Sequence, residues 1–203
     1  MILPEIQHYE EVTGVDSGFF ERLLEEDDWS FIIKLHAFIE AVATQAIVRH
    51  LREPDLADYF ARIDLSGQQT GKVRILSEIG LIGKPIRRFI SSLSQLRNSL
   101  VHDVRNVSYD LQASVNSMSS KELRRFSQDF SCLRFIKYET STDSISLIPH
   151  FEIDEAELNK LVEQPRLFIL LGALSLLNSL YDMGGYSDYK QYEKAMRVLK
   201  NKD

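Results

Sequence analysis

Three residues near the middle of the chain have the types and the spacing that chemistry on a phosphate ester needs. The stretch RNSLVHD contains Arg97, Asn98 and His102, and it follows a helical run with one apolar face. A histidine can take a proton from a hydroxyl group or give one to a leaving oxygen. An arginine can hold a phosphate with its fork of N–H donors and stabilise the growing negative charge. Asn98 can orient either the arginine or the phosphate by hydrogen bonding. The three residues therefore predict cleavage of a phosphodiester, such as that of RNA, without a metal ion.

The spacing of the arginine and the histidine sets a geometric condition. On an ideal α-helix five residues turn about 500°, so Arg97 and His102 point roughly 140° apart and lie about 7.5 Å apart along the axis. They can converge if the helix loosens at its end, or if a second copy approaches across a two-fold axis and one cleft holds two arginines and two histidines. The structural alternative is that the pair stabilises the fold, with Glu40 or Asp103 as partners.

Charge is distributed unevenly along the chain. The formal net charge of −6 gives no overall attraction for nucleic acid. Residues 1–30 hold nine acidic residues and one basic residue, whereas residues 72–105 hold seven basic and two acidic ones. Residues 121–137 are also basic, with five basic and two acidic residues. The general interpretation is solvated helix faces; the more specific one is a local phosphate site near the motif. The candidate supporting residues are Glu40, Arg87, Arg88, Asp103 and Arg105.

Motifs for several other kinds of site are missing from the sequence. One cysteine, Cys132, excludes an internal disulfide and a multi-cysteine zinc site. There is no HExxH and no histidine pair at helical spacing, so no metal is expected. Neither GxGxxG nor GxxxxGK[ST] occurs, and Gly-x-Ser-x-Gly is absent, so a nucleotide cofactor or the commonest serine hydrolase site is not expected either.

Hydrophobic periodicity predicts a chain that is mainly helical. Two segments are exceptions. Residues 104–120 are polar and predict a loop with a short strand. The alternating segments around TSTD predict a β-hairpin near 132–149. Pro85 suits the first turn of its helix, and Gly184-Gly185 suits a helix end. Helices are expected within residues 16–27, 29–51, 54–63, 66–83, 84–103, 119–130, 153–164, 166–182 and 187–201.

These elements predict one all-α domain over residues 1–203, an antiparallel bundle of four to five main helices with the hairpin as an insertion. Its parts are an acidic segment 1–27, core helices 28–103 with the motif, an insertion 104–150 and closing helices 151–203. The apolar stretch 167–181 is too short to span a bilayer, and the N-terminus has no signal-peptide pattern. We therefore expect a cytoplasmic protein that does not contact a membrane.

The motif resembles one found in a known superfamily. Arg97-Asn98-x-x-x-His102 is similar to the RX4–6H motif of the HEPN superfamily (higher eukaryotes and prokaryotes nucleotide-binding), in which a polar residue commonly follows the arginine. The layout of residues 61–103 resembles the mannitol-repressor-like branch, where an LGLI helix precedes an IRNxxAH-type helix; Val101 stands at the alanine position here. Glu40 in HAFIEA also resembles that branch. The resemblance covers about residues 28–103 and 166–182, and leaves out the acidic N-terminus and the hairpin.

The resemblance implies a HEPN-like bundle that forms a homodimer and cleaves RNA without metal at the dimer cleft. Arg97 and His102 would be the catalytic pair, and Asn98 the polar helper. The first expectation is an endoribonuclease of a toxin or defence type, with RNA as substrate and an antitoxin or regulatory protein as a candidate partner. The alternative is a non-catalytic regulator or protein-interaction module, as in the mannitol-repressor-like branch, in which the motif is structural.

Overall fold

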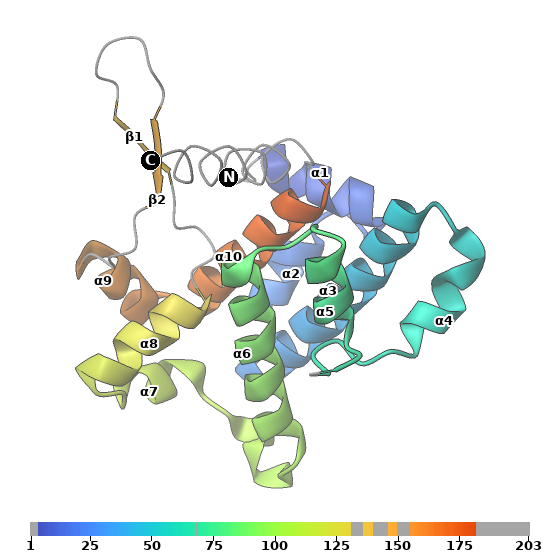
Figure 1. The fold of residues 1–203 in the computed structure, drawn as a ribbon. Helices are drawn as coiled ribbons and strands as arrows, with labels where there is room; N and C mark the ends of the chain where they lie inside the picture. Colours follow the sequence, from blue (N-terminus) through green and yellow to red (C-terminus); the bar gives the residue numbers. More distant parts are fainter. Residues whose placement is uncertain (1–3, 68, 131–135, 140–145, 150–154, 182–203) are drawn as a thin grey trace.

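The computed structural model is built almost entirely of α-helices, which agrees with the all-α class (Figure 1). It describes residues 4–67, 69–130, 136–139, 146–149 and 155–181. The helix predicted over 187–201 and Cys132 lie outside these ranges. The elements are α1 Pro4–Thr13, α2 Phe19–Glu25, α3 Asp28–Leu51, the 3₁₀ helix η1 Pro54–Leu56, α4 Ala57–Ala61, α5 Lys72–Glu78, α6 Lys84–Val101, the 3₁₀ helix η2 Val104–Ser108, α7 Leu111–Asn116, α8 Ser120–Phe130, β1 Ile136–Glu139, β2 Ser146–Pro149, α9 Glu155–Glu163 and α10 Pro165–Tyr181.

The two strands overlap the segment for which the sequence predicts a hairpin. β1 and β2 pair antiparallel, with Ile136 opposite Pro149 and Glu139 opposite Ser146. The turn between them, residues 140–145, and the flanking residues 132–135 lie outside the described residues. The hairpin over 132–149 therefore stays a prediction, as does any role for it.

The centre of the molecule is α3, against which α4, α5, α6 and α10 pack. Eleven of its 24 residues are buried, and Phe31, Leu35, Ile39 and Ile47 have almost no exposed surface. Among the described helices, α3 alone is long and apolar enough to cross a membrane by length and composition. The core helix of a soluble protein meets the same criterion, so this finding leaves the cytoplasmic location an expectation.

The apolar residues predicted for α6 face this core. Phe89, Ile90 and Leu93 are fully buried at helical spacing, which places the opposite side of α6 in solvent. α8 lies alongside α6, and the rings of Phe89 and Phe130 meet edge to face with centroids 5.8 Å apart. The position and outward face of α6 matter because its C-terminal end carries the motif.

The acidic N-terminal segment contains one more helix than the sequence predicts. Residues 4–13 form α1, and the carboxylate of Glu10 is buried against the start of α2. It accepts hydrogen bonds from the backbone N–H groups of Gly18 (2.9 Å) and Phe20 (3.1 Å). A residue of the preceding helix therefore caps α2. A cap supplied from a distance leaves no local sequence signal.

Residues 104–116 are helical, whereas the sequence predicts a loop with a short strand. The side chain of Asp103 accepts a hydrogen bond from the N–H of Arg105 (2.9 Å) at the start of η2. Asp110 accepts one from the N–H of Ala113 (2.7 Å) at the start of α7. Each helix is only five or six residues long, which is too short for hydrophobic periodicity to reveal.

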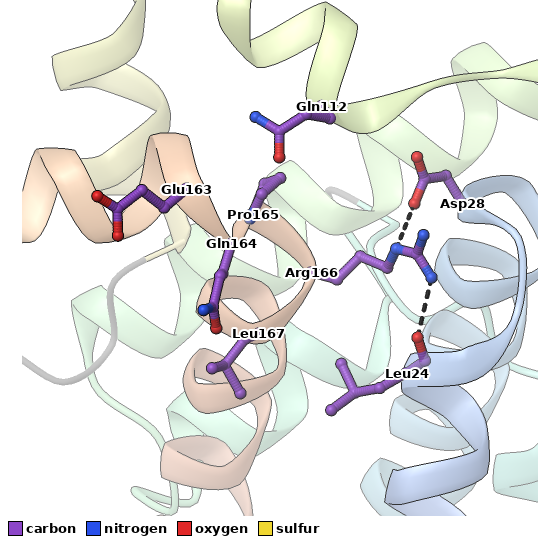
Figure 2. Close-up of a pocket in the computed structure, with 8 residues that line it drawn as sticks. All are labelled: Leu24, Asp28, Gln112, Glu163, Gln164, Pro165, Arg166 and Leu167. Atoms are coloured by element: carbon purple, nitrogen blue, oxygen red, sulfur yellow. Dashed lines mark hydrogen bonds and ion pairs between the residues drawn. The ribbon is translucent and has the colours of Figure 1, made fainter.

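Asp28 joins the first turns of three helices that are distant in sequence. It lies at the start of α3, and its Oδ2 accepts a hydrogen bond from the N–H of Leu111 (2.7 Å), the first residue of α7. Its Oδ1 lies 2.6 Å from Nε of Arg166, at the start of α10, in an ion pair (Figure 2). Arg166 Nη1 also donates to the carbonyl of Leu24 (2.9 Å). One carboxylate thus holds α3, α7 and α10 together.

We expect Asp28→Ala to lower the free energy of unfolding by about 2–3 kcal/mol, because a buried N–H and a guanidinium would lose a charged partner. Arg166 is partly exposed, so solvent would recover part of the cost. Urea unfolding monitored by circular dichroism measures the change. Asp55→Ala, at an exposed position in η1, is the matched control and should change stability by less than about 0.5 kcal/mol. Equal stabilities for the two variants would contradict the role of Asp28.

Candidate functional site

The motif lies where α6 ends. α6 continues to Val101, and His102 is the C-cap residue with φ −85° and ψ −7°. Asp103 is then extended, at φ −137° and ψ 117°, and turns the chain into η2. Asn106 Nδ2 donates a hydrogen bond to the carbonyl of Ser99 (2.8 Å), which satisfies one of the last carbonyl groups of α6 and fixes η2 beneath it. The backbone around the motif is therefore well defined.

The structure brings Arg97 and Asn98 together. Nη1 of Arg97 donates a hydrogen bond to Oδ1 of Asn98 at 3.1 Å. Arg97 is half-buried on the side of α6 that faces α3, and Asn98 is exposed. The bond uses one of the five N–H donors of the guanidinium, so Asn98 can hold Arg97 in place while other donors stay available to an anion.

His102 stands apart from this pair. Its side chain is exposed, and no hydrogen bond or ion pair joins it to another residue in the described part of the chain. Because α6 remains helical up to Val101, Arg97 and His102 keep the angular separation of roughly 140° that helix geometry gives. The first route to convergence, a loosened helix end, is therefore not used here. The second route, a second copy across a two-fold axis, is the one that remains.

The acidic residues proposed as structural partners of the motif are paired elsewhere. Glu40 forms an ion pair with Lys72, Oε1 to Nζ 3.2 Å, and Lys72 is almost completely buried. Asp103 binds Arg105, whose Nε donates to both carboxylate oxygens at 3.0 Å. These hydrogen bonds lower the pKa of Asp103. Among the described residues, neither carboxylate forms an ion pair with Arg97 or His102.

Two of the three arginines proposed as supporting residues, Arg87 and Arg88, lie at the other end of α6. Arg88 Nε is 3.7 Å from Oδ1 of Asp129 in α8, and Arg87 is exposed. They are nine and ten residues before Arg97, which corresponds to about 14–15 Å along the helix. They therefore cannot contact the same phosphate group as the motif, although they can contact another part of a long substrate.

A buried polar contact beneath Arg97 escaped the sequence analysis. His36, on α3, is 9% exposed, and its Nε2 lies 3.1 Å from Oγ of Ser94, one turn before Arg97 on α6. Burial lowers the pKa of His36, the carboxylate of Glu40 opposes that shift, and the charges of Arg97 and Lys72 add to it. In the sequence His36 is one of several scattered histidines, and nothing local pairs it with a serine 58 residues away.

The burial of His36 makes stability depend on pH. The folded chain holds the pKa of His36 below its ordinary value of 6.5, so the unfolded chain takes up the proton first as the pH falls. We expect the free energy of unfolding to decrease as the pH drops from 6.5 through the lowered pKa, and this contribution to level off below it. In His36→Gln it should be missing. Urea unfolding of both proteins at pH values from neutral to mildly acidic measures it, and parallel stability curves would refute it.

A separate hollow lies at the junction of α9 and α10, away from the motif (Figure 2). Its volume is about 330 Å³. Arg166 already binds Asp28 and the carbonyl of Leu24, and two carboxylates in the lining outnumber this single cation. A phosphate would be repelled there. The lining residues are Leu24, Asp28, Gln112, Glu163, Gln164, Pro165, Arg166 and Leu167.

No group of three or more histidine, cysteine, aspartate or glutamate side chains with the arrangement of a metal site occurs among the described residues. Comparison with known proteins found no matching family model, curated protein or solved structure. The resemblance of Arg97-Asn98-x-x-x-His102 to the RX4–6H motif therefore rests on the residues themselves, and the function it implies is a proposal.

Proposed function

We propose that the protein is a metal-independent endoribonuclease of the HEPN type, of a toxin or defence class, with a HEPN-like helical bundle and an active site in the cleft between two copies. One observation supports this proposal above others. Arg97 and Asn98 are hydrogen-bonded in the last turns of α6 and His102 caps that helix; Asn98 and His102 are exposed, and the carboxylates Glu40 and Asp103 are bound to other cations. The three polar side chains therefore remain available to a substrate.

In the proposed reaction the 2′-hydroxyl of the RNA attacks the adjacent phosphorus atom. His102 of one copy takes the proton of that hydroxyl, and the partner's His102 gives a proton to the departing 5′ oxygen. The products are a 2′,3′-cyclic phosphate and a 5′-hydroxyl, so atoms and charges balance without water or a metal. Arg97 binds the non-bridging phosphate oxygens and stabilises their growing charge, and its bond to Asn98 fixes the direction of the fork.

Both this chemistry and the angular separation of Arg97 and His102 on α6 support a homodimer. One histidine cannot act as base and acid in the same displacement, and a single α6 offers only His102 at this position. Two copies related by a two-fold axis supply two histidines and two arginines to one cleft. Arg97 of one copy and His102 of the other can then contact the same phosphate, although the two residues lie on different sides of α6.

The test is cleavage of an end-labelled RNA in EDTA by the purified chain, beside the same sequence with 2′-O-methyl groups throughout. We expect the unmodified RNA to be cut to fragments with 2′,3′-cyclic phosphate ends, and the methylated RNA to stay intact. Sedimentation should show a dimer under the same conditions. Cleavage that EDTA abolishes, or that persists on the methylated strand, would rule out this mechanism. No cleavage by a folded dimer would rule out the function.

A further inference from the structure

Two exposed helix turns carry the same pattern of basic residues. KPIRR opens α6 and KELRR opens α8, so each has the form Lys-x-x-Arg-Arg. The three cations of each turn are spaced i, i+3 and i+4, which places them on one side of the helix. The apolar residue within each pattern, Ile86 or Leu123, lies on the inner side. All six cations are exposed: Lys84, Arg87, Arg88, Lys121, Arg124 and Arg125. We call them the paired basic turns.

α6 packs against α8 (Figure 1), and the carboxylate of Asp129 links one arginine from each basic turn. Arg88 Nε is 3.7 Å from Oδ1 of Asp129, and Arg125 Nε is 3.8 Å from Oδ2 of the same carboxylate. The two arginines therefore lie on either side of one acidic group. Burial raises the pKa of Asp129, and the charges of Arg88 and Arg125 oppose that shift.

The fold itself gains little from these cations. A positive charge in the first turn of a helix opposes the helix dipole, and the first turn of α6 holds no acidic residue to compensate. Lys84, Arg87, Lys121 and Arg124 form no ion pair with another described residue. The dipole rule is therefore broken at the start of α6, which is typical of positions that serve binding, whereas Glu122 in the first turn of α8 compensates the cations there.

The basic turn of α6 shares its face with the motif. Residues 84, 87, 91, 95, 98 and 102 follow one another at intervals of three or four, so they line one side of the helix, and each is exposed or half-buried. Asn98 and His102 thus lie at one end of a polar stripe that begins at Lys84. The 18 residues between its ends span about 27 Å. Each nucleotide of a stacked strand advances about 3.4 Å along the strand's axis, so about eight nucleotides cover that length.

We propose that the RNA lies along this face of α6, with its backbone phosphates bound by the paired basic turns and the phosphate to be cut between His102 of this face and the partner's Arg97. This inference rests on the proposed function and names how its substrate is held. It accounts for a local basic surface on a chain of net charge −6. Because phosphates carry no base identity, the contribution to binding is independent of sequence and sensitive to salt.

The test is RNA binding in the His102→Ala background, which separates binding from cleavage. Fluorescence anisotropy would compare labelled RNAs of about 16 and about 4 nucleotides, one longer and one shorter than the stripe. Two variants remove two cations each, Lys84→Gln/Arg87→Gln and Lys121→Gln/Arg124→Gln. They leave Arg88 and Arg125 in place because these hold Asp129. The matched control, Arg62→Gln/Arg74→Gln, removes two exposed cations, one at the C-cap of α4 and one in α5.

We expect each basic-turn variant to weaken binding of the long RNA at least tenfold. It should also reduce the slope of log K against log salt by about 1.4, the value for two lost contacts to a single strand. The affinity of the basic-turn variants for the short RNA should change less than twofold. The affinity of the control variant for either RNA should also change less than twofold. The proposal is overturned if the basic-turn variants match the control, or if phosphatidylserine-rich vesicles bind the basic turns and RNA does not. If the basic-turn variants, with His102 intact, cleave RNA as fast as the wild type, the RNase function is supported and the role of this surface is not. If the basic turns bind RNA but the wild type cleaves none, the surface is supported and the RNase function is not.

Discussion

Replacing His102 with alanine is expected to lower the rate of RNA cleavage by about 10²–10⁴-fold, the usual contribution of a general acid–base group. Both histidines of the cleft are lost at once in a symmetric dimer, so the larger end of this range is expected. The fold should be unaffected, because His102 is exposed and makes no hydrogen bond to another described residue. The measurement is the single-turnover cleavage rate in EDTA, with circular dichroism and sedimentation confirming an intact dimer.

Substitution of Arg97 tests the second half of the same site. Arg97→Ala should lower the rate by about 10²–10³-fold, as removal of a group that stabilises developing charge does. Arg97→Lys keeps the charge and loses the planar fork, so most of the loss in rate should remain.

The matched control for His102→Ala is His50→Ala, at an exposed position in the last turn of α3. This variant should cleave RNA like the wild type.

The opposite pattern would favour the non-catalytic alternative. Arg97 lies beside His36 and Ser94, so its removal could disturb the contact between α3 and α6. If the wild type cuts no RNA while Arg97→Ala lowers stability or dissociates the dimer, the motif is structural. The protein would then be a regulator or interaction module whose partner does the work.

The long helices could be predicted because their apolar residues repeat with the helical period over many turns. α6 is the clearest case: a helical run with one apolar face was predicted there, and Phe89, Ile90 and Leu93 on that face are fully buried. The RNxxxH trio was placed correctly at the end of that helix for the same reason, since the period stops there. Whether these residues are catalytic stays a prediction.

Contacts between distant segments could not be predicted. The cap that Glu10 supplies to α2, the contact of His36 with Ser94 and the hold of Asp28 on Leu111 each depend on how separate elements pack. A single sequence carries periodicity and local caps, but it does not state which helix faces which. The paired basic turns show the same limit, because the repeated pattern is visible in the sequence while its shared surface requires the packing of α6 on α8.

Gly172 shows how far packing can reverse a local rule. By helix propensity alone, Gly172→Ala in the middle of α10 should stabilise the protein by about 1 kcal/mol. A Cβ at this position, however, would lie 2.4 Å from the carbonyl oxygen of Phe130 and 2.7 Å from Cε2 of Phe89. Both neighbours are buried, and the carbonyl belongs to the backbone at the end of α8. The substitution must therefore push the end of α8 and the ring of Phe89 on α6 away from α10.

We expect Gly172→Ala to lower the free energy of unfolding by about 3 kcal/mol, the upper range for overpacking a core. Asn178→Ala, at an exposed position on the same helix, is the control and should gain up to about 0.5 kcal/mol from propensity. Urea unfolding of the three proteins decides the matter by sign, because packing and propensity predict opposite changes at Gly172. A variant as stable as the wild type would mean that α8 can move without cost. In that case the close approach of α8 to α6, on which the shared basic surface depends, would not be fixed by the core.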